Sequence, residues 1–287
     1  FIKVFFIWYC LSPAIVPAGY GKFASMGRPN DCGLCSAHLR KGCCMLLELT
    51  RRCNLECPVC YASAGKCGDD PNIEDIERQY DFLMAHVGPF NIQLSGGEPT
   101  LREDLPEKIW LGRQKGFTFF QLNTNGIRLA AEPDYAKSLK AAGLNTVFLQ
   151  FDGMSDAVYE ALRGRPLLRE KLAAIESCAA AGLGIVLVPV IAPGVNEEEA
   201  GGILRLAMTR MPYVRGVHFQ PLSYFGRCAL KRAERPVTIP RMLRLIEKQT
   251  EGMMKYTDFC GGGAESPYCS FHASYMRRGD GSLRLLG

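Results

Sequence analysis

Three cysteines in the first half of the chain have a spacing that suits metal chemistry. Cys53, Cys57 and Cys60 follow the pattern C-x3-C-x2-C within residues 50–61. Iron–sulfur clusters are held by cysteine thiolates, normally four for a [4Fe-4S] cluster. Three close ligands would bind three irons and leave the fourth open, as a catalytic zinc keeps one position open. The spacing therefore predicts a [4Fe-4S] cluster with one open iron.

Two other interpretations of the three cysteines are a zinc knuckle and a group of buried free thiols. A zinc ion requires a fourth Cys or His close by, often as a second CxxC pair. No such residue stands at that spacing. The residues that follow, in the loops of the predicted fold, also favour the cluster.

The elements that would position these cysteines alternate along the chain. Strands are expected at residues 45–49, 91–94, 117–122, 146–151, 185–191 and 217–220, with helix-period runs between them. Glycines at 116, 143 and 182 stand where helices should end. The predicted fold class is therefore α/β, a parallel sheet with outer helices. An incomplete (βα)6 TIM-like barrel, with a small Cys-rich N-terminal extension, fits better than a full eight-unit barrel.

Polar residues and glycines follow several of the expected strands, so they should meet at one rim of the barrel. They are Gly96, Gly97 and Glu98 after the second strand, Asn125 after the third, and Gln150 and Asp152 at the end of the fourth. The glycines would let the backbone approach a ligand closely, and Glu98 could accept hydrogen bonds from an ammonium group. Taken singly, each is equally consistent with an ordinary turn or cap. His218 is expected to be a packed histidine rather than a ligand.

The C-x3-C-x2-C motif followed by Tyr61, together with the Gly-Gly-Glu-Pro run at 96–99, resembles the radical S-adenosylmethionine (SAM) superfamily over residues 45 to about 221. The resemblance implies that SAM chelates the open iron through its amino and carboxylate groups. One electron from the cluster then splits the C5′–S bond, and the 5′-deoxyadenosyl radical abstracts hydrogen from a substrate. It implies that the Gly-Gly-Glu loop holds the methionine amino group. Tyr61 would pack by the adenine, with Asn125, Gln150 and Asp152 near the ribose or substrate.

The remaining cysteines suggest a second metal site. The candidate ligands lie near the two ends of the chain and are Cys32, Cys35, Cys43, Cys260 and Cys269. Distant ends of a chain can meet on one domain face, so we expect an auxiliary iron–sulfur cluster or a mononuclear iron or zinc site. Redox-inert thiols, or one structural zinc made by the N-terminal group alone, are the alternatives.

The Cys-rich stretch before residue 45 indicates a subgroup within this superfamily. It is similar to radical SAM proteins with a cysteine-rich N-terminal extension, a group that includes pterin-modifying methylases, tetraether lipid synthases and the (seleno)proteins called TrsS. The segment at 266–272, Ser-Pro-Tyr-Cys-Ser-Phe-His, fits the last of these best. The first thirty residues depart from the family pattern.

Composition limits the classes of partner. The chain has 287 residues and a formal net charge of +5 without a basic run, so no nucleic-acid partner is expected. The apolar run at 4–11 is shorter than the about 20 residues of a membrane span, and clustered thiols predict a reducing cytoplasm. We expect a poorly ordered leader at 1–28, a Cys-rich extension at 29–44, the core at 45–225 and a C-terminal segment at 226–287.

The sequence favours a radical SAM enzyme acting on an unidentified substrate, with an electron donor such as flavodoxin or ferredoxin. Methylation or carbon–carbon bond formation is suggested by analogy with the family. The alternative is a non-catalytic iron–sulfur or zinc protein for electron transfer or scaffolding. Glu98 and the polar strand ends favour the enzyme, because an electron carrier needs no SAM pocket. A zinc hydrolase would need a His/Glu set around an open metal, which the sequence does not show.

Overall fold

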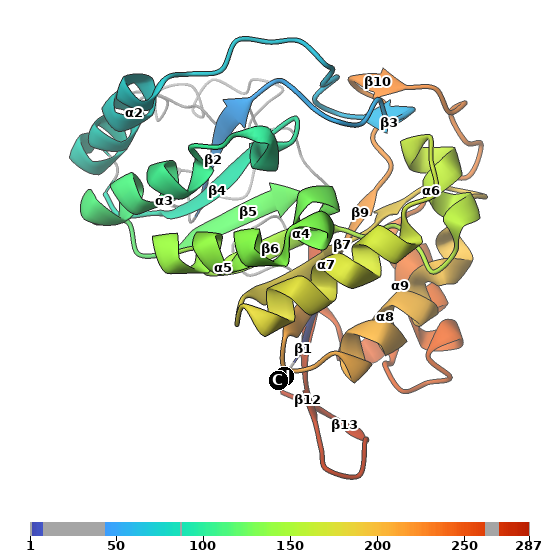
Figure 1. Cartoon of the computed structure of the whole chain (residues 1–287). Coiled ribbons are helices and arrows are strands. Elements are labelled where there is room, and N and C mark those ends of the chain that lie inside the picture. Colours follow the sequence, from blue (N-terminus) through green and yellow to red (C-terminus); the bar gives the residue numbers. More distant parts are fainter. Residues whose placement is uncertain (1, 8–43, 87, 262–269, 287) are drawn as a thin grey trace, which may run out of the picture.

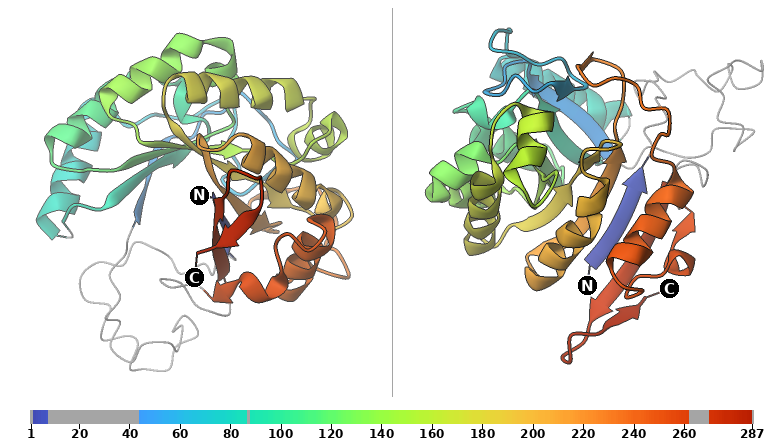
Figure 2. Two further views of the ribbon diagram at one scale, coloured as in Figure 1. Left: turned by 90° about the horizontal axis from the view of Figure 1, so that it is seen from below. Right: turned by 90° about the vertical axis from the view of Figure 1, so that its right-hand side faces the viewer.

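The computed structural model describes residues 2–7, 44–86, 88–261 and 270–286. Its largest feature is a curved sheet (Figures 1 and 2). The strands are β1 Ile2–Ile7, β2 Cys44–Thr50, β4 Asn91–Gly96, β5 Phe120–Thr124, β6 Thr146–Gln150, β7 Gly184–Val188, β8 Val190–Ile191, β9 Val214–Pro221, β11 Cys260–Gly261, β12 Ser270–Arg277 and β13 Leu283–Leu285. The spatial order is β11-β12-β1-β9-β7-β6-β5-β4-β2, with β13 paired to β12 and β8 to β9.

The central part of this sheet is parallel throughout. Strands β2, β4, β5, β6, β7 and β9 pair in parallel with their neighbours, and helices cover the outer, convex face (Figure 2). The helices are α2 Ile73–His86, α3 Leu105–Gln114, α4 Ile127–Ala131, α5 Pro133–Ala142, α6 Asp156–Arg163, α7 Leu168–Ala180, α8 Ala200–Thr209 and α9 Ile239–Gln249. The partial (βα)6 barrel expected from the alternation is therefore confirmed.

Burial alternates along the strands because successive side chains point to opposite faces. In β4, Ile92 and Leu94 are fully buried beneath the helices, while Gln93 between them faces the inner side and stays partly exposed. The glycines expected to end helices do so, since Gly116 and Gly143 adopt φ values of +99° and +111°. The parallel sheet thus presents an apolar outer face to the helices and a more polar concave face inward.

The start of the chain differs from expectation. Residues Ile2–Ile7 form β1, which pairs in parallel with β9 and antiparallel with β12, and Ile2 and Val4 are fully buried. The expectation of a poorly ordered leader is wrong for these residues; residues 8–28 and most of the Cys-rich extension lie outside the described residues. The apolar run was too short to distinguish a strand from a leader by itself, because its partners lie at the other end of the chain.

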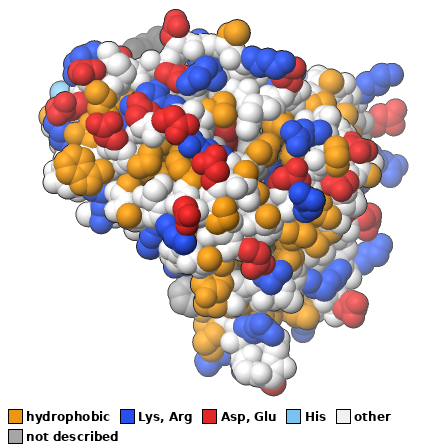
Figure 3. All heavy atoms as spheres, in the orientation of Figure 1, with side chains coloured by type: hydrophobic (Ala, Val, Ile, Leu, Met, Phe, Trp, Pro, Cys, Tyr) orange, Lys and Arg blue, Asp and Glu red, His pale blue; other side chains and the backbone are white. Residues whose placement is uncertain are grey.

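Two further observations concern the surface. No helix in the described ranges is long and apolar enough to span a membrane. On the face shown in Figure 3, acidic and basic side chains are interspersed over the helices. Such mixing gives this face no extended field of one sign.

Candidate active site

The loop after β2 carries the three cysteines of the C-x3-C-x2-C motif. Cys57 is buried beside Leu55 and Tyr159, and the half-buried Cys53 and Cys60 pack against the same group. Burial raises the pKa of the Cys53 thiol to about 11, and the neighbouring thiols Cys57 and Cys60 add to the rise. A site of this kind disfavours bare thiolates, so it needs a cation to stabilise them.

The three thiols can be compared with the ligand sets of a single ion and of a cluster. Within the parts of the chain that the structure describes, no three His, Cys, Asp or Glu side chains lie close enough to hold one metal ion. In a [4Fe-4S] cluster each thiolate binds a different iron, so its ligands lie farther apart than those of one zinc. Metal coordination also deprotonates a thiol outright, which offsets the raised pKa. A cluster at the cysteine loop therefore stays a prediction.

Gly96 and Gly97 bring the loop after β4 against the backbone of the cysteine loop. A Cβ at Gly96 would stand 2.1 Å from the Thr50 carbonyl oxygen, and one at Gly97 would stand 2.2 Å from the Arg52 carbonyl oxygen. The Gly97 N–H donates to the Thr50 carbonyl at 2.8 Å. The glycines therefore permit a close approach to the cysteine loop itself, a reason the sequence analysis did not identify.

Glu98 joins two of the strand-end loops. Its side chain is 1% exposed. One carboxylate oxygen accepts hydrogen bonds from the Thr100 amide at 3.1 Å and from the hydroxyls of Thr100 and Thr124 at 2.6 and 2.7 Å. The other oxygen accepts from the Asn125 amide at 2.7 Å. The carboxylate therefore ties the end of β4 to the end of β5.

Asn125 and Gln150 are linked by Lys171, which the sequence analysis missed. The Asn125 side chain donates to the Asn54 side chain of the cysteine loop at 2.7 Å. The fully buried Lys171 ammonium donates to the Asn125 carbonyl and, at 3.0 Å, to the Gln150 side-chain oxygen. Burial lowers the pKa of Lys171 to about 8. The sequence could have indicated that Lys171 is buried, because Lys171 shares helical spacing with the buried Ala174 and Cys178 of α7.

Asp152 and Arg163 form a buried ion pair under the cysteine loop. Arg163 donates through two nitrogens to the two Asp152 carboxylate oxygens at 2.7 and 2.8 Å. Its remaining terminal nitrogen donates to the Val59 carbonyl at 3.0 Å. Burial raises the pKa of Cys57, and the Arg163 charge opposes that rise. The Asp152 carboxylate, expected near the ribose or substrate, is thus engaged by Arg163.

The chain after β9 closes over the other side of the cysteine loop. Strand β10 (Arg227–Cys228) pairs with β3 (Val59–Cys60). Arg227 donates to the carbonyls of Cys57 at 2.7 Å and Ala64 at 2.9 Å. Gly226, with φ +69°, lies so close to Tyr61 that a Cβ would stand 2.3 Å from its carbonyl oxygen. This clamp was not foreseen, because Arg227 has no sequence pattern in common with the motif it holds.

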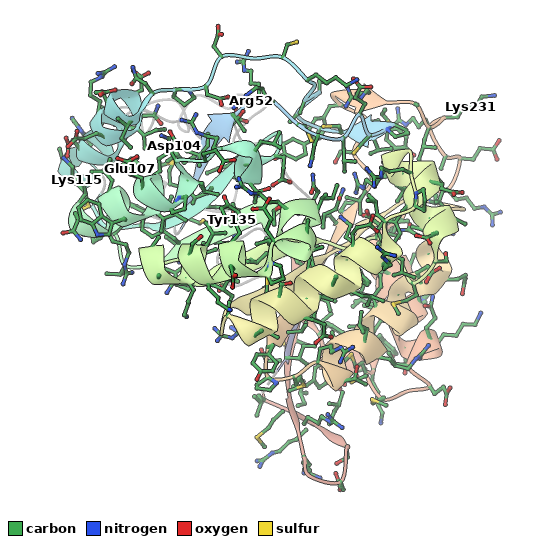
Figure 4. All side chains as sticks on the ribbon, viewed as in Figure 1. Arg52, Asp104, Glu107, Lys115, Tyr135 and Lys231 are labelled. Atoms are coloured by element: carbon green, nitrogen blue, oxygen red, sulfur yellow. The ribbon has the colours of Figure 1, made fainter. Side chains whose placement is uncertain are left out.

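A second network supports the start of the cysteine loop from outside. Arg52 pairs with Asp70, which also accepts from Thr50. Arg102 donates to the Leu49 carbonyl at 2.9 Å and binds Asp104 at the beginning of α3. Hydrogen bonds from Arg102 hold the pKa of Asp104 well below its usual range. Figure 4 shows Arg52 after β2 and Asp104 on the same side of the barrel.

A cavity of about 250 Å³ lies at the carboxyl ends of β8 and β9. Its lining includes apolar and aromatic side chains, among them Ile191, Pro221, Leu222 and Tyr224. Leu222 also packs in one cluster with Val59 of the cysteine loop. The cavity therefore adjoins the proposed cluster site.

The chain matches the family model described as the radical SAM superfamily over residues 47–207. The chain belongs to the radical SAM superfamily. It is 46% identical over 238 residues to the 7,8-dihydro-6-hydroxymethylpterin dimethyltransferase of Methanocaldococcus jannaschii, covering 81% of this chain and 47% of the relative. It is 32% identical to the GTP 3′,8-cyclase of Paenarthrobacter nicotinovorans, covering 74% of this chain and 58% of the relative. The chain thus spans about half the length of these curated relatives.

Solved structures show the same fold. Streptococcus suis SuiB bound to S-adenosylmethionine superposes with a TM-score of 0.60 at 15% identity, over 74% of this chain and 48% of that chain. The structure of anSMEcpe with bound AdoMet gives a TM-score of 0.54 at 18% identity, over 72% and 60% of the two chains. These likenesses confirm the partial barrel fold. The similarity to the TrsS group stays a prediction.

The predicted auxiliary ligands are only partly described. Cys260 is exposed in β11 and lies opposite His272 of β12. The other candidates, Cys32, Cys35, Cys43 and Cys269, lie outside the described residues. The described residues therefore bring together one predicted ligand and one histidine.

We predict that Gly97→Ala impairs cluster binding. The added Cβ would displace the Arg52 carbonyl and with it the cysteine loop, at a cost of about 1–3 kcal/mol. Iron bound per chain and visible absorbance after anaerobic reconstitution measure the effect. Gly279→Ala is the control, because a Cβ there meets nothing within 4 Å. Full iron loading of Gly97→Ala would contradict the prediction.

We predict that Asp152→Asn lowers the free energy of unfolding by about 3–5 kcal/mol, since it leaves the buried Arg163 guanidinium without a counter-charge. Urea unfolding followed by far-ultraviolet circular dichroism measures it. Asp134→Asn is the matched control, because its pair with Lys137 is exposed and should add nothing measurable. Equal midpoints for the two variants would refute a stabilising role for the buried pair.

Proposed function

We propose that this protein is a radical SAM enzyme that cleaves SAM reductively at a [4Fe-4S] cluster held by Cys53, Cys57 and Cys60. When bound and reduced, the cluster would supply one electron to SAM, whose C5′–S bond would break to give methionine and a 5′-deoxyadenosyl radical that takes a hydrogen atom from substrate. The observation that carries the proposal is the three-cysteine loop, locked against the Gly96–Gly97 backbone and the Asp152–Arg163 pair.

The chain's own residues would bind and orient SAM around this loop. The polar strand ends Asn125 and Gln150 are held in place by Lys171, so they are pre-organised for the ribose or the methionine part of SAM. Tyr61 and the largely apolar cavity, whose lining includes Ile191 and Pro221 but also Arg232 and Glu234, would take the adenine. The backbone at Gly96, Gly97 and Glu98 would lie by the methionine amino group. Apolar lining would keep water from the reacting centre.

We further propose that the substrate reaction is a methylation. The support is the 46% identity to a protein named as a pterin dimethyltransferase, although the chain spans 47% of that relative. A small reductant protein such as flavodoxin or ferredoxin would deliver the electron. Seven of the described cysteines, namely Cys53, Cys57, Cys60, Cys67, Cys178, Cys228 and Cys260, are free thiols, which suits a reducing compartment such as the cytoplasm.

Anaerobic reconstitution with iron and sulfide, followed by dithionite and SAM, tests the function. We expect 5′-deoxyadenosine, measured by chromatography, and expect Cys57→Ala to abolish it, because one iron loses its thiolate. Cys67→Ala is the matched control: Cys67 is exposed and outside the motif, so its product yield should equal that of the wild type.

The alternative, a non-catalytic iron–sulfur or zinc protein, predicts that no 5′-deoxyadenosine forms. A reconstituted wild-type protein that binds iron or zinc but never yields 5′-deoxyadenosine would favour it. Loss of the product in Cys67→Ala would instead show that the motif cysteines are not a sufficient ligand set.

We also propose an auxiliary metal site with ligands among Cys32, Cys35, Cys43, Cys260 and Cys269. The support is the pairing of Cys260 with His272 across β11 and β12, which places two metal-binding groups side by side. The site would hold an iron–sulfur cluster or a mononuclear iron or zinc ion.

Metal analysis of Cys260→Ala tests this second site. We expect more metal per wild-type chain than one [4Fe-4S] cluster contains, and expect the excess to fall in Cys260→Ala while the SAM-cleaving cluster remains. Cys178→Ala is the control, because Cys178 is buried in α7 and is not one of the proposed ligands. A single cluster's metal in the wild type, unchanged by Cys260→Ala, would remove the proposal.

A further inference from the structure

The concave face of the sheet carries a group of uncharged polar side chains, and all of them except Gln150 lie outside the set of residues proposed to bind SAM. Register places Gln93 beside Gln121 and Asn123 beside Phe148. Five inward-facing polar residues of β4, β5 and β6 are together called the amide wall. They are Gln93, Ser95, Gln121, Asn123 and Gln150.

Hydrogen bonds hold the amide wall in one arrangement. Gln93 donates to the Asn123 side-chain oxygen at 2.7 Å, and Asn123 donates to the Ser95 hydroxyl at 3.3 Å. Lys171 donates to the Gln150 side-chain oxygen at 3.0 Å and so holds this carboxamide in place. Each carboxamide has two N–H donors and two acceptor positions, and these contacts use only part of them.

The amide wall is connected to the cysteine loop. The Tyr61 hydroxyl lies 3.3 Å from the Ser95 hydroxyl, and Tyr61 directly follows the third motif cysteine. A molecule on the amide wall would therefore lie next to the loop proposed to hold the cluster. Radical hydrogen abstraction requires this proximity, because the reacting atoms must lie in near contact.

The charge and the aromatic content of the amide wall indicate which ligands it would bind. Among the described residues, the inward-facing side chains of β4, β5 and β6 carry no charge. Glu48 of β2 is the register neighbour of Ser95, the Lys171 ammonium of α7 reaches Gln150, and Lys3 and Arg215 are on β1 and β9, beyond β7. Phe148 lies among the amides and meets His218 edge-on at 6.0 Å. The wall thus combines an aromatic surface with neutral hydrogen-bonding groups.

We propose that the amide wall binds the substrate as an uncharged planar heterocycle, through adjacent ring N–H and C=O groups of a lactam or aminopyrimidinone edge. Asn and Gln side chains pair with such edges through two hydrogen bonds at once, as they do with adenine. A phosphate group would find no cation on β4, β5 or β6 to offset its desolvation. This inference rests on the proposed function and deepens it by naming the substrate class.

Binding of three probes to the reconstituted full chain tests the inference, measured anaerobically by titration calorimetry without reductant. The probes are 7,8-dihydro-6-hydroxymethylpterin, guanosine and GTP. We expect the pterin to bind, and expect GTP to bind no more tightly than guanosine. Asn123→Leu should weaken pterin binding at least about tenfold, the loss of one bidentate pair.

A second variant and a matched control keep the test independent of folding. Gln121 is the register neighbour of Gln93 but is not a member of the hydrogen-bond chain of Gln93, Asn123 and Ser95, so Gln121→Leu should weaken pterin binding without disturbing that chain. Gln79→Leu, on the exposed side of α2, should bind as the wild type does.

Three results would overturn the inference: no pterin binding by the wild type, GTP binding at least about tenfold tighter than guanosine, or variants of Asn123 and Gln121 that bind the pterin as Gln79→Leu does. Because no reductant is present, these results are separate from SAM cleavage. Wild-type protein that makes 5′-deoxyadenosine but fails the binding test retains the proposed function and loses the substrate class.

Discussion

The cysteine loop has almost no regular structure of its own, so its geometry depends on backbone groups that neighbouring loops supply. The Gly97 amide holds Thr50, Arg163 holds the Val59 carbonyl, and Arg227 holds the Cys57 carbonyl. Buried carbonyls left without donors would cost about 1–3 kcal/mol each. These contacts therefore do more than stabilise the fold: they fix the backbone that positions the three sulfurs.

Buried charges at the strand ends serve the same purpose. Glu98 joins the ends of β4 and β5, and Asp152 joins β6 to α6 through Arg163. A buried ion pair gains little net stability, but losing one partner is costly. Such groups fix a unique arrangement of loops around the cysteines. Lys171 extends this arrangement to Asn125 and Gln150, and so to the concave face.

Much of the fold followed from local patterns. The six parallel strands and the glycines that end helices follow from periodicity and from glycine's tolerance of positive φ. The motif cysteines, Gly96, Gly97 and Glu98 were found because their spacing in the chain is characteristic. Strand β1 and the Arg227 clamp were not found, because each depends on partners far away in the sequence.

The sequence by itself determined the family, the alternating α/β order and the three thiols, since each of these depends on the spacing of residues that are close together in the chain. Tertiary structure alone decided what the polar strand ends do. Glu98 and Asp152 proved to be bonded within the protein, and Gln93, Gln121 and Asn123 came together on one face. These contacts depend on strand register and burial. They cannot be read from local spacing, because neighbouring strands in a parallel sheet are separated by whole helices in the chain.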